Sequence, residues 1–417
     1  MNDQWKRNAT LFLASQAVSL FGSTLVELAI IWQITLTTQS GSMMTLFVLL
    51  GVLPTVLISP LAGVWADRYS RRLVIAVSDA LVAGCTLVLA VLLWSGYDGV
   101  WLLLAASAIR ALGEGIQLPA LNALLPQFVP LEHLTRVNAA LSMIQSGTNL
   151  LAPLLSAALL AATSIQVIFL VDVFTAVVAV AILLLFLRVP EHRREENKDE
   201  PGYLADLRSG MAYVARHRYL KAFFVFASLF FVLLGPIAYL SPLQVARTYG
   251  DEVWRLSALE IGYAVGMMVG GFLMAAWGGF PNRLYDMALS VLVHGVCTLL
   301  LGLPPSFSLY LALMGAVGVI MPLYSTSSTT LLQERVEEEY QGRVFSVHSI
   351  VSSSLMPLSV AVYGPLADVV PVEALMTATG AGMVVLSLVM LGSRPLRQAG
   401  RRAEPSRSGR EGTAKLE

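Results

Sequence analysis

Hydrophobic and polar positions fall into long blocks along this chain, with extended apolar runs separated by short polar connections. A helix of about 20 apolar residues crosses the hydrocarbon layer of a bilayer. A backbone in lipid must satisfy its own hydrogen bonds, and barrel strands need only about 10 residues, so such runs predict transmembrane helices. We expect an all-α integral membrane protein with twelve helices, at residues 11–36, 43–65, 73–94, 100–121, 137–161, 165–187, 220–245, 256–278, 284–303, 307–332, 344–367 and 372–391.

The amino-acid composition supports this prediction and excludes several other classes of protein. Of the 417 residues, 56% are hydrophobic and only 13% are charged. A typical globular domain has about 25% charged residues, so a disordered chain, a coiled coil and a water-soluble enzyme are excluded. The net charge of zero gives no reason to expect a nucleic-acid partner. Cys85 and Cys297 lie in apolar runs and the histidines lack metal-ligand spacing, so we expect no metal and no cofactor.

The basic residues predict the orientation in the membrane, because cytoplasmic loops near helix ends retain Lys and Arg. With the amino terminus inside, nearly all of the 27 basic residues fall on the cytoplasmic side, and only Arg247 and Arg255 lie outside. An odd number of crossings would remove this asymmetry. We therefore expect a multi-pass protein with both termini in the cytoplasm.

The polar connections also predict how the chain is divided. We expect a first six-helix bundle at 1–188, a charged cytoplasmic linker at 189–219, a second bundle at 220–393 and a disordered cytoplasmic tail at 394–417. The linker contains apolar residues spaced three and four apart, which predicts an amphipathic helix on the membrane or on the underside of the protein. These residues are Leu204, Leu207, Met211 and Val214.

The two bundles contain a weak internal repeat. Residues 124–137 align with 331–344 without gaps, and Glu132 and Arg136 match Glu339 and Arg343. Both copies follow the fourth helix of a bundle. This predicts a duplication in which the two bundles are related by a pseudo-two-fold axis normal to the membrane.

The connection after the second helix reads GVWADRYSRR. An acid beside three arginines in a tight turn can form a network that joins the two halves on the cytoplasmic side, although the arginines alone would also serve to anchor topology. The segment resembles the signature of the major facilitator superfamily, Gly-x-x-x-Asp-(Arg/Lys)-x-Gly-Arg-(Arg/Lys), with Ser70 in place of the second glycine. The resemblance implies a cytoplasmic gate. We add to this gate the acid and the base of the internal repeat, Glu132 and Arg136. The gate residues are Gly63, Asp67, Arg68, Arg71, Arg72, Glu132 and Arg136.

Further segments resemble the drug:proton antiporter branch of this family, which includes macrolide and tetracycline efflux proteins. These are GVWADRYSRR, IRALGEGIQLPALNALLPQFVP and the SGS after the first helix. The antiporter signature of the fifth helix, Gly-Pro-x-x-Gly-Gly, reads APLLSA here at residues 152–157. Small residues replace its glycines, which retains close packing but departs from the pattern typical of exporters. The resemblance implies a bacterial inner membrane.

Charges inside a membrane are costly and need a partner or a function. The candidates away from helix ends are Glu27, Asp79, Arg110, Glu114 and Asp172. In the fold that the resemblance implies, the first, fourth, seventh and tenth helices line a central cavity, which would hold Glu27, Arg110 and Glu114, with the other two at the periphery. We expect Glu27 to exchange a proton. The alternatives are a fixed Glu27–Arg110 ion pair and a local pair between Arg110 and Glu114, one helical turn apart.

Polar and aromatic residues near the cavity suggest walls for an amphipathic ligand, namely Trp32, Gln33, Tyr239 and Gln244. An aromatic side chain in a membrane helix is more often a packing group. The small-residue ladder Gly262, Gly266 and Gly270 is expected to be a packing face rather than a site.

The chain contains no GxxxxGK(S/T) loop and no connection large enough for a nucleotide-binding domain, which favours a secondary transporter over a pump. The resemblance implies a monomeric, proton-coupled exporter of small amphipathic drugs that works by alternating access in lipid. Transport of another solute, such as a siderophore or a lysolipid, is an alternative. An integral-membrane enzyme is a distant one, because it would need a catalytic cluster at one membrane face, and we therefore expect no enzymatic activity.

Overall fold

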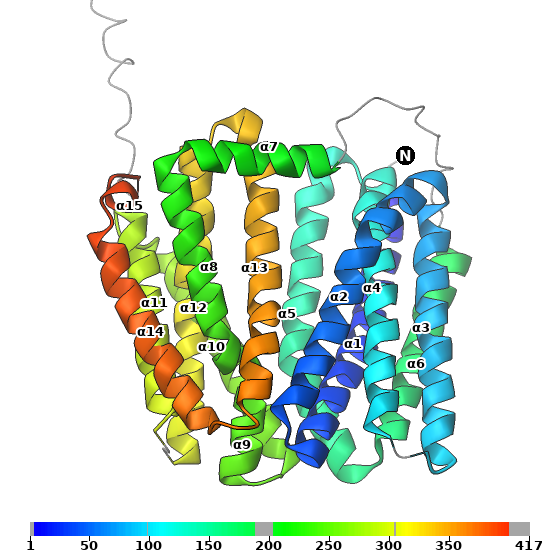
Figure 1. The fold of residues 1–417 in the computed structure, drawn as a ribbon. Coiled ribbons are helices and arrows are strands. Elements are labelled where there is room, and N and C mark those ends of the chain that lie inside the picture. The colour runs from blue at the N-terminus through cyan, green and yellow to red at the C-terminus, as the bar shows by residue number, and fades with distance from the viewer. Residues whose placement is uncertain (1–3, 98, 188–202, 304–305, 400–417) are drawn as a thin grey trace, which may run out of the picture.

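The computed structural model describes residues 4–97, 99–187, 203–303 and 306–399, which form a bundle of roughly aligned helices (Figure 1). Twelve helices are long and apolar enough to cross a membrane, which confirms the predicted number. The first half contains α1 (Gln4–Thr38), α2 (Gly41–Arg68), α3 (Arg71–Trp94), α4 (Val100–Phe128), α5 (Leu131–Ala162) and α6 (Ile165–Ala181), which continues as the π-helical η1 (Ile182–Phe186). The second half contains α8 (Arg218–Tyr239), α9 (Ser241–Tyr249), α10 (Val253–Trp277), α11 (Arg283–Leu301), α12 (Phe307–Arg335), α13 (Glu338–Leu366) and α14 (Val372–Gly392).

Helix pairing repeats between the two halves. In the first half α2 packs against α4, α3 against α6 and α1 against α5; in the second half α10 packs against α12, α11 against α14 and α8 against α13. Between the halves, α2 packs against α13 and α5 against α10. Each contact therefore has a counterpart after exchange of the halves, as the predicted pseudo-two-fold axis requires.

Several helices extend beyond the apolar segments that predict them. The first was expected at 11–36, but α1 has 35 residues, a length of about 50 Å at ~1.5 Å per residue. This exceeds the ~30 Å hydrocarbon layer. The helix continues because its hydrogen bonds do not depend on the lipid boundary, and Trp5 near its start stacks on His133 of α5 at 4.4 Å between ring centroids.

The seventh crossing is broken, whereas the sequence predicted one helix at 220–245. The helix α8 ends at Tyr239, and α9 starts at Ser241 with Pro242 in its first turn. Proline has no N–H to continue the preceding helix but is well suited to begin a new one. The Ser241 hydroxyl donates to the Ile237 carbonyl and so satisfies part of the freed backbone.

Helix α7 (Tyr203–Arg216) lies across one end of the bundle, while α9 lies at the opposite end (Figure 1). The segment expected to hold the amphipathic linker helix is helical, and one residue of the expected apolar face, Val214, packs against the core of the second half. Met211 is 50% exposed, whereas Gly210 faces the Arg343 backbone and Tyr213 stacks on Tyr340 of α13 at 4.4 Å. The start of α1 and the short helix α15 also lie at the α7 end (Figure 1).

The tail expected to be disordered at 394–417 is helical at its start. Helix α15 covers Arg394–Ala399 and buries Leu396 against the second half. The Arg335 side chain donates to the Ala399 carbonyl at 2.7 Å, which holds the end of this helix in place. The rest of the predicted tail, 400–417, lies outside the described residues, as does the charged part of the linker at 188–202.

The glycine ladder of α10 is a packing face, as predicted. A Cβ at Gly266 would overlap the Gly315 carbonyl, and one at Gly270 would overlap the backbone of Val319 on α12. Small residues thus allow α10 and α12 to approach closely, which is how helices associate where the surrounding lipid supplies no hydrophobic driving force.

Candidate functional site

The buried guanidinium of Arg110 joins four helices of the first half. From α4 it pairs with Asp172 of α6, with 2.5 Å between the guanidinium nitrogen and the carboxylate oxygen. It also donates to the Ser23 carbonyl of α1 at 3.1 Å and to the Thr86 hydroxyl of α3 at 3.3 Å. The Asp172 side chain is 3% exposed and that of Arg110 is 13% exposed, so protein encloses the carboxylate and most of the guanidinium.

This pairing corrects the expected partners of Arg110, which were Glu27 or Glu114. The fold that the resemblance implies puts Asp172 at the periphery, because its helix is an outer one. The helix is close enough because Gly22 of α1 has no side chain: a Cβ there would overlap the Thr175 hydroxyl and lie 3.3 Å from the Asp172 carboxylate. Close packing of α1 on α6 therefore brings the inner face of α6 within reach of Arg110.

The other intramembrane ionisable residues of the first half share one cavity with Arg110. This first cavity has a volume of about 170 Å³ and is lined by Glu27, Asp79, Arg110 and Glu114. Gln117 donates a hydrogen bond to Asp79 at 3.0 Å. Among the described residues, neither Glu27 nor Glu114 forms an ion pair with a basic side chain.

Glu27 lies close enough to the second half to interact electrostatically with groups there. It lies within electrostatic range of Tyr239 on α8 and of Glu260 on α10, as well as of Glu114 and Arg110. Glu260 was not among the predicted residues because it lies near the start of an apolar segment. The signal was nevertheless present, since it is an acid inside a run long enough to span a membrane.

Two further cavities adjoin this region. The second cavity, of about 450 Å³, lies between α8, α10, α11, α12 and α13 of the second half, and Glu260, His294 and Tyr324 are among its lining residues. The third cavity, of about 340 Å³, lies between α1, α5 and α10. It shares Glu260 and Tyr263 with the second cavity and Thr24 with the first. The third cavity, which lies between the two halves, therefore adjoins both of the others.

The four residues predicted to form cavity walls have other surroundings. Trp32 is fully buried and packs in the large hydrophobic core of the second half. Gln244 is buried, donates to the Leu301 carbonyl at 2.8 Å and accepts from the Tyr310 hydroxyl at 3.0 Å. Tyr239 packs on the core of the first half, and Gln33 is half-buried. None of the four is among the described residues that line the three cavities.

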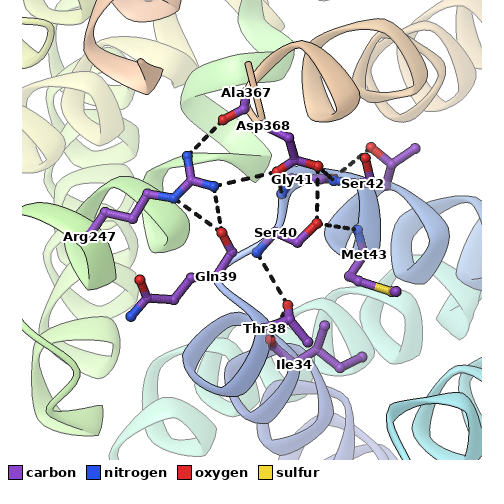
Figure 2. A network of polar contacts seen from close by, with 11 residues as sticks. Ile34, Thr38, Gln39, Ser40, Gly41, Ser42, Met43, Arg247, Ala367 and Asp368 are labelled. Atoms are coloured by element: carbon purple, nitrogen blue, oxygen red, sulfur yellow. Dashed lines mark hydrogen bonds and ion pairs between the residues drawn. The ribbon is translucent and has the colours of Figure 1, made fainter. Parts of the chain in front are cut away.

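At the α9 end, polar contacts join the two halves (Figure 2). Asp368, between α13 and α14, accepts hydrogen bonds from the Ser40 hydroxyl at 3.0 Å, the Gly41 N–H at 2.6 Å and the Ser42 N–H at 3.0 Å. Arg247 of α9 donates to the Gln39 carbonyl and also pairs with Asp368 at 3.4 Å. We call residues 39–42 with Arg247 and Asp368 the α9-end seal.

The Asp368 carboxyl has a lowered pKa. Partial burial acts to raise the pKa, but the hydrogen bonds from Ser42, Gly41 and Ser40 outweigh burial and hold it below its ordinary value of 3.8. Nearby, the Thr45 hydroxyl of α2 donates to the Val360 carbonyl of α13 at 2.9 Å. The α9-end seal is thus a hydrogen-bonded interface between the halves that favours the charged form of Asp368.

At the α7 end, the predicted gate arginines bind backbone within the first half. Arg71 donates to the carbonyls of Ala66 at 3.2 Å and Ala123 at 2.6 Å, which lie near the ends of α2 and α4. Arg72 donates to the Leu184 and Leu187 carbonyls at the end of η1. In the second half, Arg283 donates to the Gly278 carbonyl. In both Arg71 and Arg283 the acceptor lies five residues earlier in the chain, so the same contact recurs in the two halves.

The remaining predicted gate residues lie at the same end. Glu132, near the start of α5, is exposed and lies 3.5 Å from His133, and Arg68 and Arg136 are exposed. Gly63 has open space where a Cβ would be. The side chain of Asp67 lies outside the described residues.

Comparison with known proteins agrees with this architecture. A family model described as Major Facilitator Superfamily matches residues 9–361. The chain is 29% identical over 389 residues to Macrolide efflux protein A of Streptococcus pyogenes, covering 93% of this chain and 96% of that protein. It is 30% identical over 321 residues to Macrolide efflux protein A of Enterococcus faecalis, covering 76% of this chain and 99% of that protein.

Solved structures share the fold at low sequence identity. A mutant form of the nucleoside transporter NupG superposes with a TM-score of 0.71 at 14% identity, covering 92% of this chain and 98% of that one. A bacterial homolog of the human lysosomal transporter Spinster, in an inward-facing and unoccupied conformation, has a TM-score of 0.68 at 14% identity, covering 97% and 100%. With twelve spanning helices, paired halves and a matching family model, the chain is a multi-pass membrane protein that belongs to the major facilitator superfamily.

Proposed function

We propose that this protein is a monomeric, proton-coupled exporter of macrolide-like amphipathic drugs that works by alternating access. The relatives named macrolide efflux protein A support the substrate class and the direction. The repeated helix pairing supports a rocking motion of two similar halves about cavities at their interface.

The observation that supports proton coupling most directly is that Glu27 and Glu114 line the first cavity together with an arginine that is paired with another acid. Arg110 is already paired with Asp172, so its positive charge is not reserved for Glu27 or Glu114. Ionisable groups at this depth are costly unless they are paired or functional. We therefore assign Glu27, which lies within electrostatic range of groups in both halves, as the group that gains and loses a proton, with Glu114 and Asp79 as further acidic groups of the same cavity.

The conformation fits one stage of such a cycle. The many arginines at the α7 end, among them Arg68, Arg71, Arg72 and Arg136, favour the cytoplasmic side for this end. The α9-end seal then closes the external side, so that drug enters from the cytoplasm while Glu27 is ionised. Entry of a proton from outside, after the seal opens, releases the drug.

The gate assigned to the α7 end would close in the opposite stage. Gly63, Asp67, Arg68, Arg71, Arg72, Glu132 and Arg136 would then join the halves on the cytoplasmic side. Replacing Asp67 with Asn is expected to slow transport without changing the range of substrates. A changed substrate range would contradict a gating role.

The deciding experiment is macrolide uptake into inverted membrane vesicles that carry an acid-inside pH gradient. Wild type is expected to take up erythromycin until an uncoupler is added, and Glu27→Gln is expected to lose the gradient-driven component. Glu338→Gln, an equally conservative change at an exposed position on α13, is the matched control. Full gradient-driven uptake by Glu27→Gln would overturn the coupling assignment. A resistance panel with no macrolide, tetracycline or dye phenotype would overturn the drug assignment.

A further inference from the structure

The second cavity has the properties of a ligand site. Its volume of about 450 Å³ falls in the range of roughly 300 to 1,000 Å³ in which small-molecule sites occur. Its walls are largely apolar and include Leu234, Ile237, Met314 and Val317. Methionine side chains at this position also adapt to ligands of different shape.

Three buried polar atoms on its walls have no hydrogen-bond partner among the described residues, one of them the Nε2 atom of His348 and two of them more deeply buried. The two more deeply buried atoms are the Tyr324 hydroxyl and the Nε2 atom of His294. Tyr324 is 2% exposed and His294 is 1% exposed, and both line the cavity. Most buried polar groups in proteins are paired, so an orphaned group facing a cavity indicates a missing partner.

The role of His294 can be assigned from its other nitrogen. Its Nδ1 lies 2.8 Å from the Ser290 carbonyl, which can only accept a hydrogen bond, so Nδ1 bears the hydrogen. In a neutral ring Nε2 is then an acceptor. The Tyr324 hydroxyl can donate. His294 and Tyr324 thus present an acceptor and a donor to a ligand in the cavity.

Glu260 is the acidic group of the site. It is the one acidic residue among the described residues that line the second cavity, and none of these is Lys or Arg. Among the described residues it forms no ion pair with a basic side chain. It also lines the third cavity and so borders both. An unpaired carboxylate beside an apolar pocket favours a cationic head on an apolar body.

We propose that the second cavity binds amphipathic organic amines, with the ammonium group at Glu260, the apolar body against the wall residues, and hydroxyl or carbonyl groups at Tyr324 and His294. The proposal rests on the proposed function and specifies the substrate class that this cavity selects. Glu260 is then a specificity-determining residue, distinct from the proton-coupling role assigned to Glu27.

The test is equilibrium binding to purified protein in lipid nanodiscs at one pH, without any gradient. One probe is erythromycin, whose dimethylamino group is charged at neutral pH. The other is its N-demethyl-N-acetyl derivative, which retains the macrolactone and has an uncharged amide. Glu260→Gln is expected to bind erythromycin about 10- to 100-fold more weakly, the scale of one charged hydrogen bond, and to bind the neutral probe as wild type does.

Tyr324→Phe is a second variant that removes only the hydroxyl. It is expected to lower the affinity for both probes by the same few-fold factor, because the hydrogen bond does not depend on the amine. Glu338→Gln, remote from the cavity, is expected to bind both probes normally. Thermal unfolding of each variant shows whether it is folded. If Glu260→Gln is unfolded, the affinities of wild type and Tyr324→Phe for the two probes still test the proposal.

Three outcomes would overturn the proposal: equal affinity of wild type for the two probes, no binding of erythromycin to wild type, or an equal loss of both probes in Glu260→Gln. The last result would indicate a site for neutral amphiphiles such as lipids. Because the proposed function is tested by gradient-driven uptake with Glu27→Gln, each hypothesis can fail while the other stands.

Discussion

The carboxylate of Asp368 accepts a hydrogen bond from the backbone N–H of Gly41 at 2.6 Å, although the two residues are 327 positions apart. Gly41 is the first residue of α2, where N–H groups have no partner inside the helix and the helix dipole favours negative charge. An acid of the second half thus caps a helix of the first. A Cβ at Gly41 would overlap the Gly364 carbonyl of α13, so the contact also depends on the absence of a side chain.

Replacing Asp368 with Asn is expected to loosen the α9-end seal, because the amide loses the charge and cannot accept at both positions. The seal is partly exposed, so we expect a loss of about 1 kcal/mol, or roughly fivefold in the ratio of closed to open α9 ends. Spin labels at Thr163 and Leu303, both exposed and near this end, would report the ratio as a change in their distance distribution.

The control for this change is Asp251→Asn, an exposed acid at the same end, which should leave the distance distribution unchanged. Both native cysteines, Cys85 and Cys297, are first replaced with Ala so that only the introduced sites are labelled. If Asp368→Asn gives the distribution of its parent, the hydrogen bonds to Asp368 do not hold the α9 end closed.

The lowered pKa of Asp368 predicts how closure depends on pH. Its hydrogen bonds favour the charged form, so its contribution to closure is fully present well above the ordinary value of 3.8 and is lost as the pH falls through the depressed pKa. The labelled protein should therefore keep its closed population from neutral pH down to about 3.8. Below this it should open further, and Asp368→Asn should lack that step. A step near neutral pH in wild type that is absent from Asp368→Asn would contradict the direction of the shift.

Removing the partner of Arg110 is expected to destabilise the first half. In Asp172→Asn the largely buried guanidinium loses its ion-pair partner, and breaking such a buried pair typically costs about 3 kcal/mol or more. The double variant Asp172→Asn with Arg110→Gln should be more stable than Asp172→Asn alone, because it removes the uncompensated charge. Thermal unfolding of wild type, both single variants and the double variant in the same detergent measures these effects. If the effects of the two single changes simply add, the residues are not coupled.

The sequence predicts the helices and the intramembrane charges well, because both follow from the cost of exposing polar groups to lipid. The twelve crossings and four residues of the first cavity are examples. It does not predict which charges pair. The choice of Asp172 over Glu27 as partner of Arg110 depends on how closely α1 and α6 approach, and that is set by Gly22 and Thr175 together rather than by either residue type.

Contacts between the halves are equally hidden in the sequence. Asp368 lies in a short connection, and no periodicity relates it to Ser40 or Arg247. Glu260 and His294 are different, because each is an ionisable residue inside an apolar run and a stricter use of the same rule would have included them. The orphaned atoms of His294 and Tyr324 become visible only when their neighbours are known.

Replacing Gly22 with Ala tests the packing that positions Asp172. The added Cβ would overlap the Thr175 hydroxyl, so α1 and α6 must separate, with an expected destabilisation of about 1 to 3 kcal/mol. Gly147→Ala on α5, where a Cβ meets nothing within 4 Å, should be neutral or slightly stabilising because Ala favours the helix. Adding Thr175→Ala to Gly22→Ala makes room for the new methyl group and should recover most of the loss in thermal unfolding. The size of that recovery measures how far the Arg110–Asp172 pair depends on the approach of α1 to α6. A Gly22→Ala protein as stable as the Gly147→Ala control would mean that this approach does not constrain the pair.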